Sequence, residues 1–161
     1  MEIYILRHGI AEVARPGQAD SARRLTAEGK QKLARILACA RKAGVRPDVV
    51  LSSPYKRAKE TAEVAREELK LARPIIETDV LTPMERAETV WDEIRIYKDA
   101  PQVMIVGHEP QLSSVACYLI GAPAGRVDLK KGAIARVDVE SIGIRPQGVL
   151  VWLLTAKLAG A

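Results

Sequence analysis

Short apolar runs alternate with helical patterns over the first two-thirds of the chain, and this alternation constrains the fold more than any other feature. The runs have the length of buried strands, and apolar residues between them recur at the 3.6-residue period of a helix. Strands are predicted at residues 2–7, 48–52, 74–80 and 102–106, and helices from Thr26 to Gly44, from Ser53-Pro54 to Leu69, at 85–98 and at 112–120. The apolar stretches 132–139 and 148–154 predict an edge hairpin. The chain is therefore expected to form an α/β, three-layer fold with a mostly parallel central sheet, helices on both faces and an antiparallel edge.

The length of 161 residues predicts one domain, 1–161, with a single sizeable core. The apolar runs are much shorter than a membrane span, and the first residues lack the pattern of a signal peptide, so no membrane partner is expected. Cys39 and Cys117 lie in apolar stretches without paired-motif spacing. This placement predicts two buried, reduced thiols and a cytoplasmic location. The sequence leaves the oligomeric state open.

A net charge of +5 is compatible with nucleic-acid binding. Aromatic residues, however, make up only 4% of the chain and Phe is absent, so side chains that could stack on bases are scarce. Because the basic residues are also scattered, no nucleic-acid partner is expected. An anionic substrate or an acidic protein partner would explain the charge equally well.

The chain contains only two histidines, and each follows directly on a predicted buried strand. His8 lies in Arg7-His8-Gly9, and His108 lies in Gly107-His108-Glu109-Pro110. Imidazole is the side chain that offers a neutral nucleophile or base near neutral pH. Ligands of an open parallel sheet bind beyond the carboxyl ends of its strands, so we expect the two histidines to converge there.

The helix predicted to begin at Ser53-Pro54 carries Lys56, Arg57 and Lys59 in its first turn, where the helix dipole disfavours cations. A bound anion would remove that cost, since the backbone N–H groups and a guanidinium would face it together. Arg57 lies next to the apolar stripe and is expected to lean over the sheet edge as a phosphate ligand. Lys56 and Lys59 are expected to face solvent.

Arg7 and His8 would point to opposite faces if the strand continued through both. Gly9 permits a turn that brings both inward and lets the backbone approach a ligand closely. Two arginines that can each bind phosphoryl oxygens with two N–H groups, together with two histidines, favour a phosphate site over a carboxylate site.

These motifs resemble those of the histidine phosphatase superfamily, and most closely those of the SixA-type phosphohistidine phosphatases. The resemblance rests on Arg7-His8-Gly9, on Arg24-Leu25-Thr26-Ala27-Glu28-Gly29, on the segment from Ser53-Pro54-Tyr55 to Thr61, and on Gly107-His108-Glu109-Pro110. It spans nearly the whole chain and implies a phosphoglycerate mutase-like fold.

The resemblance implies that His8 is the nucleophile and is transiently phosphorylated, with Arg7, Arg57 and His108 around the phosphoryl group. Gly9 and Glu109 are expected beside the substrate. It implies no metal ion and no other cofactor. The implied substrate is a phosphorylated protein, with a small phosphate ester as the alternative.

One segment departs from the family pattern. Many members use a glutamate after the third strand as the proton donor, and here residues 81–88 lack the usual surroundings of that residue. Glu85 is the candidate, and Glu88 is equally compatible with a surface helix. The nitrogen group of a phosphoramidate leaves readily once it is protonated. A site without a strong proton donor would therefore fit a phosphohistidine substrate.

Alternative readings remain open. A zinc site does not fit this pattern, because two histidines without further ligands at metal spacing supply too few ligands. Ser52 and Ser53 fit cap and turn positions better than nucleophiles, because no Gly-x-Ser-x-Gly elbow is present. Asp20, like Glu12 and Glu28, shows no pattern beyond that of a solvated surface.

Three functions fit these motifs. They are a phosphohistidine phosphatase, a phosphatase or mutase for a small phosphate ester, and a non-catalytic phosphate-binding module on the same fold. The short chain leaves little room for a lid over the site, which favours an open site and a macromolecular substrate.

Overall fold

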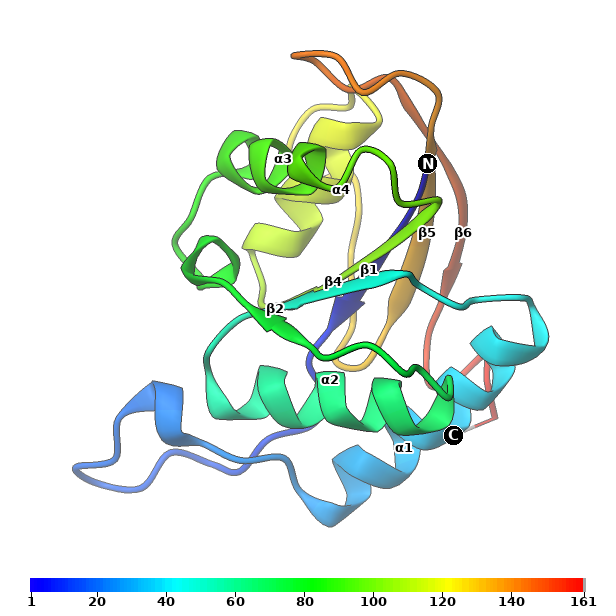
Figure 1. The fold of residues 1–161 in the computed structure, drawn as a ribbon. Helices are drawn as coiled ribbons and strands as arrows, with labels where there is room; N and C mark the ends of the chain where they lie inside the picture. The colour runs from blue at the N-terminus through cyan, green and yellow to red at the C-terminus, as the bar shows by residue number, and fades with distance from the viewer. Residues whose placement is uncertain (161) are drawn as a thin grey trace.

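A computed structural model describes residues 1–160, which form a six-stranded sheet in the order β3-β2-β4-β1-β5-β6 (Figure 1). All strands run parallel except β5, which is antiparallel to both β1 and β6. The strands are β1 Glu2–Arg7, β2 Val49–Ser52, β3 Ile76–Glu77, β4 Gln102–Gly107, β5 Ile134–Val139 and β6 Gly148–Leu154. The helices are α1 Ala27–Lys42, α2 Lys56–Glu68, α3 Ala87–Ile96 and α4 Gln111–Leu119, with 3₁₀ turns at Asp20–Ala22 and Asp79–Leu81. The predicted mixed sheet with an antiparallel edge is confirmed.

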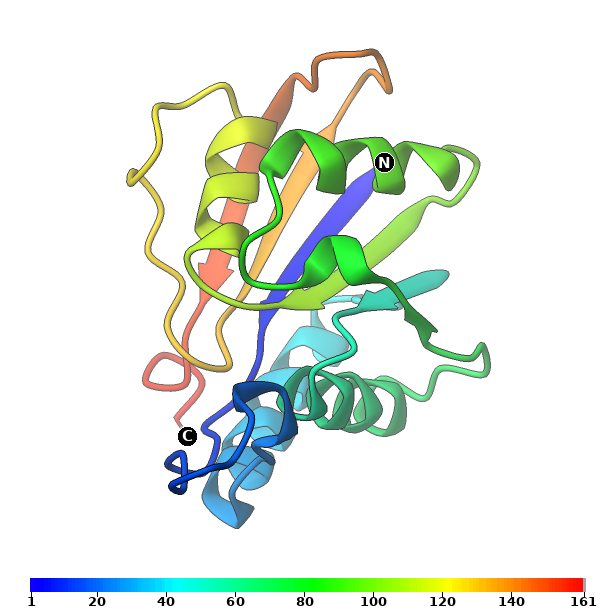
Figure 2. The same cartoon turned by 90° about the vertical axis from the view of Figure 1, so that its left-hand side faces the viewer.

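Helices cover both faces of the sheet, as predicted (Figure 1). Alternate residues of β1 point to opposite faces, so Ile3 and Ile5 pack with α3 and α4, whereas Tyr4 and Leu6 pack with α1 and α2. Both layers are apolar and fully buried at their centres, which accounts for the near-continuous apolar sequences of β1 and β4. Figure 2 shows α3 and α4 lying across one face. No helix within residues 1–160 is long and apolar enough to cross a membrane.

Several element ends differ by a few residues from the prediction, and two of these differences have a clear local cause. The strand expected at 74–80 is reduced to Ile76–Glu77, because Thr78 accepts a hydrogen bond from the Val80 backbone and starts a 3₁₀ turn. The helix expected from Ser53-Pro54 begins at Lys56 instead. Ser53 Oγ accepts the Tyr55 backbone N–H at 3.3 Å, which stabilises a turn before the helix in place of an N-cap. Proline is therefore not the first helical residue.

The segment that follows β1 passes unusually close to the start of α1. Thr26 caps α1, as predicted, with Oγ1 accepting the Gly29 backbone N–H at 3.0 Å. The Thr26 backbone N–H in turn donates to the Ile10 carbonyl at 2.9 Å. A Cβ placed on Gly29 would lie 2.3 Å from that same carbonyl oxygen. The contact therefore requires glycine, and it anchors the segment that immediately follows His8.

We expect Gly29→Ala to lower the free energy of unfolding by roughly 1–3 kcal/mol, because one backbone segment must move to admit the methyl group. Denaturant unfolding of both proteins measures the difference. Gly143→Ala is the control, since its Cβ would meet nothing closer than 3.7 Å. Equal stability of Gly29→Ala and wild type would contradict the close approach.

Candidate active site

The order of the strands brings the three sequence motifs together. β4 lies between β1 and β2, and their parallel register aligns the carboxyl ends of all three strands. The hydrogen bonding continues just past the strands, where His8 N–H donates to the Gly107 carbonyl at 3.0 Å and Ser53 N–H donates to the Val106 carbonyl at 2.9 Å. His8, Ser53 and His108 therefore start from neighbouring positions on one edge.

The two imidazoles face each other across this edge. Their ring centroids are 5.1 Å apart and their planes are tilted by 55°. His8 is 6% exposed and His108 is 1% exposed. The expected convergence of the two histidines is what the structure shows.

His8 is held in one tautomer. Its Nδ1 lies 2.8 Å from the Gly9 carbonyl oxygen, and because a carbonyl can only accept, Nδ1 carries the proton. Nε2 then has a free lone pair, and the Arg57 Nε–H donates to it at 3.2 Å. Gly9 N–H donates to Thr61 Oγ1 at 3.1 Å, and this bond holds Gly9, whose carbonyl orients the His8 ring. A neutral imidazole with an oriented Nε2 lone pair can act as a nucleophile.

The surroundings of both rings favour the neutral form. Burial, followed by the charges of Arg57, Arg7 and Lys131, lowers the pKa of His8 to about 4, against the opposing hydrogen bond to Gly9. For His108, burial and then the neighbouring charges lower the pKa to about 3. A lowered pKa favours the unprotonated ring, so both histidines are neutral at pH 7.

His108 is bonded at one nitrogen only. Its Nε2 lies 2.8 Å from Ser53 Oγ, while Nδ1 is buried and has no hydrogen-bond partner within residues 1–160. The Tyr55 ring packs against the imidazole with centroids 5.0 Å apart. Ser53 is thus a partner of His108 as well as a turn residue, a contact that the local sequence does not reveal.

The charges of two arginines, Arg7 and Arg57, act on both imidazoles. Arg7 NH1 donates to the Leu129 carbonyl at 2.7 Å, and its buried Nε has no partner within the described residues. The Arg57 side chain is only 5% exposed, although it is the second residue of α2. Lys56 is exposed, and Lys59 pairs with Glu77 at the surface, in keeping with their predicted positions. An unpartnered guanidinium N–H and a buried positive charge are features that suit the binding of an anion.

Asp20 is exposed, as predicted, but it also contacts Arg57, which the sequence did not predict. Its backbone oxygen accepts Arg57 NH1 at 2.7 Å and its Oδ2 accepts Arg57 NH2 at 2.9 Å. The partners are 37 residues apart in the sequence, and Asp20 lies in a polar segment with no periodicity. No local signal in the sequence could have identified this contact.

The two glutamates proposed from sequence do not join the histidines. The carboxylate of Glu109 accepts hydrogen bonds from Ser113 N–H at 3.1 Å and from Ser113 Oγ, so it binds the start of α4. Its charge also raises the pKa of Arg7, opposing the larger lowering by burial. Glu85 is exposed and lies in a surface groove beside Ser114 and Tyr118. Its backbone oxygen accepts a hydrogen bond from Gln111 Nε2 at 3.3 Å.

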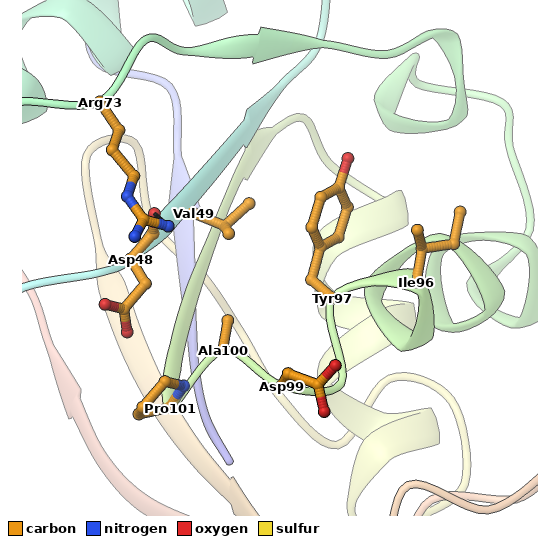
Figure 3. A pocket seen from close by; sticks show the side chains of 8 residues that line it. All are labelled: Asp48, Val49, Arg73, Ile96, Tyr97, Asp99, Ala100 and Pro101. Atoms are coloured by element: carbon orange, nitrogen blue, oxygen red, sulfur yellow. Dashed lines mark hydrogen bonds between the residues drawn. The ribbon is translucent and has the colours of Figure 1, made fainter.

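Other grooves lie away from the histidines. One of about 280 Å³ is found at the opposite edge of the sheet, where β2 and β4 begin (Figure 3). Its lining combines Asp48, Arg73, Tyr97 and Asp99, and Arg73 already donates to the Asp48 carbonyl at 3.3 Å. Within residues 1–160, no group of three or more His, Cys, Asp or Glu side chains is arranged to hold a metal ion. Both cysteines are free, with Cys117 buried and Cys39 only half-buried.

We expect both histidines to stay neutral from about pH 8 down to about pH 5, because protonation of each ring requires a pH near its lowered pKa. NMR titration of the imidazole resonances measures this, and only two sets of signals need assignment. The unfolded protein in urea is the reference and should titrate near the ordinary histidine value of about 6.5. A folded-state pKa of either ring near that reference would contradict the described surroundings.

Comparisons with known proteins identify the family of this chain. The family model of the histidine phosphatase superfamily, branch 1, matches residues 3–84, and the chain belongs to this superfamily. A curated relative, an uncharacterized protein of Picosynechococcus sp., is 29% identical over 138 residues, covering 83% of this chain and 82% of the relative.

Solved structures share the fold. The protein histidine phosphatase SixA complexed with tungstate is similar at a TM-score of 0.87 and 24% identity, covering 98% of both chains. A protein assigned as a phosphohistidine phosphatase SixA from Agrobacterium tumefaciens is similar at a TM-score of 0.82 and 25% identity, covering 96% of this chain and 97% of that one. The alpha-ribazole phosphatase from Shigella flexneri has a TM-score of 0.76 at 19% identity, covering 97% of both chains.

Proposed function

We propose that this chain is a phosphatase that removes the phosphoryl group from phosphohistidine in a signalling protein, through a covalent intermediate on His8. The observation that carries the proposal is the state of His8. Its Nδ1–H is bonded to the Gly9 carbonyl, and its Nε2 lone pair lies at the buried guanidinium of Arg57. A neutral nucleophile next to a fixed positive charge is the arrangement that attack on a phosphoryl group requires.

In the first step, the substrate's phosphohistidine ring has taken a proton from solvent at its other nitrogen. His8 Nε2 attacks phosphorus, the bond to the leaving nitrogen breaks, and the substrate imidazole leaves neutral. Charge develops on the equatorial oxygens, where the free donors of Arg7, Arg57 and His108 would meet it. Water then attacks the phosphohistidine, and orthophosphate leaves with His8 neutral again. These groups supply the charge stabilisation, so the proposed mechanism uses no metal ion.

The acid–base properties of the site favour a phosphoramidate over an alkyl ester. An alkoxide is a poor leaving group and needs a proton donor, whereas a protonated imidazole leaves without one. Glu85 is exposed beside α4, and Asp20 is bound by Arg57 and Arg23. Partial burial raises the pKa of Asp20, but the hydrogen bonds and charges of these two arginines together outweigh that effect. The pKa is lowered overall, so Asp20 is ionised at neutral pH. Neither carboxyl group is suited to donate a proton to an alkoxide.

The relatives support the same substrate class. The two SixA proteins are phosphohistidine phosphatases by name and match almost the full chain, while the more distant alpha-ribazole phosphatase acts on a small phosphate ester by name. Free cysteines fit a reducing compartment such as the cytoplasm. The proposal therefore includes a signalling protein as the substrate and a cytoplasmic location.

We expect the wild-type protein to release phosphate from a phosphohistidine-bearing protein domain, and His8→Ala to release none while keeping its fold. A phosphoserine peptide and a small sugar phosphate serve as competing substrates, and circular dichroism checks the variant. Preferential hydrolysis of the sugar phosphate would favour a metabolic phosphatase. Binding of phosphate without release from any substrate would favour the non-catalytic module.

Arg57→Ala is expected to reduce kcat by about 10²–10³-fold, which is the usual effect of deleting one donor to a developing oxyanion. Lys59→Ala is the matched control, since it removes an exposed cation from the same helix. Steady-state kinetics with the phosphohistidine domain compare the two. An Arg57→Ala rate equal to that of Lys59→Ala would remove Arg57 from the phosphate site.

A further inference from the structure

The guanidinium of Arg57 is held from several directions. Its Nε–H points at His8 Nε2, at 3.2 Å, and its two terminal nitrogens are each held by Asp20, at 2.7 and 2.9 Å. The Tyr55 ring lies against the group, with its centroid 5.2 Å from Arg57 Cζ. Three of the five N–H donors of the guanidinium are thereby assigned, and two stay available for a ligand.

Asp20 is itself held in place. Its Oδ1 accepts Arg23 Nε at 2.8 Å and Arg23 NH2 at 2.7 Å, while Arg23 NH1 donates to the Glu12 carbonyl at 2.9 Å. A backbone hydrogen bond from Glu12 N–H to the Arg24 carbonyl, at 2.9 Å, joins the two ends of the segment that contains Asp20. A chain of contacts therefore runs from the backbone at Glu12, through Arg23 and Asp20, to Arg57 and His8.

An isolated arginine side chain has many rotamers, and ordering it costs up to about 2 kcal/mol of conformational entropy. The contacts of Asp20 select the rotamer in which Nε–H faces the reactive nitrogen. The side chain of Asp20 is itself 55% exposed, so it contributes little to the core. Its only partners at hydrogen-bond distance among the described side chains are Arg23 and Arg57.

We propose that Asp20 is a positioning residue that fixes Arg57 in the orientation needed to bind the phosphoryl group beside His8. This inference rests on the proposed phosphatase function and adds to it a residue that does not touch the substrate. Asp20 acts through Arg57, and the 3₁₀ turn Asp20–Ala22 is the element that presents it.

Phosphate affinity separates this role from a simple charge effect. A carboxylate near a phosphate site repels the anion, so deleting it should tighten phosphate binding if Asp20 acted only as a charge. If Asp20 positions Arg57, deleting it should instead weaken binding, because the donors lose their alignment. The two roles therefore predict opposite signs for Asp20→Ala.

The experiment measures inorganic phosphate binding by calorimetry and phosphohistidine hydrolysis by steady-state kinetics for wild type, Asp20→Ala and Asp20→Asn. We expect Asp20→Ala to bind phosphate several-fold more weakly and to lose about 10- to 100-fold in kcat/KM. Asp20→Asn keeps an acceptor oxygen for Arg57 without the charge and should bind phosphate more tightly than Asp20→Ala does.

Asp92→Ala is the matched control. Asp92 forms an exposed pair with Arg95 at 2.9 Å, with the same i,i+3 spacing as Asp20 and Arg23, but it lies on α3. It should leave both phosphate affinity and turnover unchanged. Phosphate binding by Asp20→Ala that is as tight as, or tighter than, that of wild type would overturn the positioning role. A wild-type protein that binds phosphate but hydrolyses nothing would instead count against the proposed activity.

Discussion

The pairing of β4 with both β1 and β2 is the interaction on which the site depends. Through it, residues near positions 8, 53 and 108 are brought to one edge, although long segments separate them in the chain. The backbone hydrogen bonds from His8 to Gly107 and from Ser53 to Val106 extend this alignment one residue past the strands. A register shift of one residue would turn each functional side chain to the other face of the sheet. The close packing of these fully buried strands makes such a shift costly.

The site combines positive charge with neutral imidazoles. Arg7 and Arg57 are largely withdrawn from solvent, and their charges disfavour a proton on either ring. The same charges that keep His8 unprotonated would therefore attract the phosphoryl group that it attacks. Asp20 raises the pKa of His108, against the larger lowering effects of burial, His8 and Arg57. On the proposed function, one set of residues thus maintains both the nucleophile and the anion site.

The sequence predicted most of the fold, because strong apolar runs and helical periodicity carry the architecture. It also predicted which residues would meet, since strands of a parallel sheet present their carboxyl ends together. The start of α2 was predicted too early, because Ser53 uses its hydroxyl to bind the Tyr55 N–H and His108 instead of capping a helix. Asp20 was missed for a different reason: its contact with Arg57 joins distant segments, and such a contact leaves no periodic signal. Glu85 was placed by family resemblance alone, and its exposed position follows from a turn whose geometry the sequence does not specify.

The position of β1 in the sheet also bears on how the molecule is made. β1 precedes its two neighbours, β4 and β5, by about a hundred residues in the chain, so its partners are synthesised well after it. During that interval the apolar segment Ile3–Leu6 has no strand partner, whereas β2 and β3 can already pair. β1 can pair only once β4 has been made, and such long-range pairing is intrinsically slow. Until then the apolar segment of β1 lacks its neighbours in the nascent chain, and the two histidines can meet only after β4 is complete.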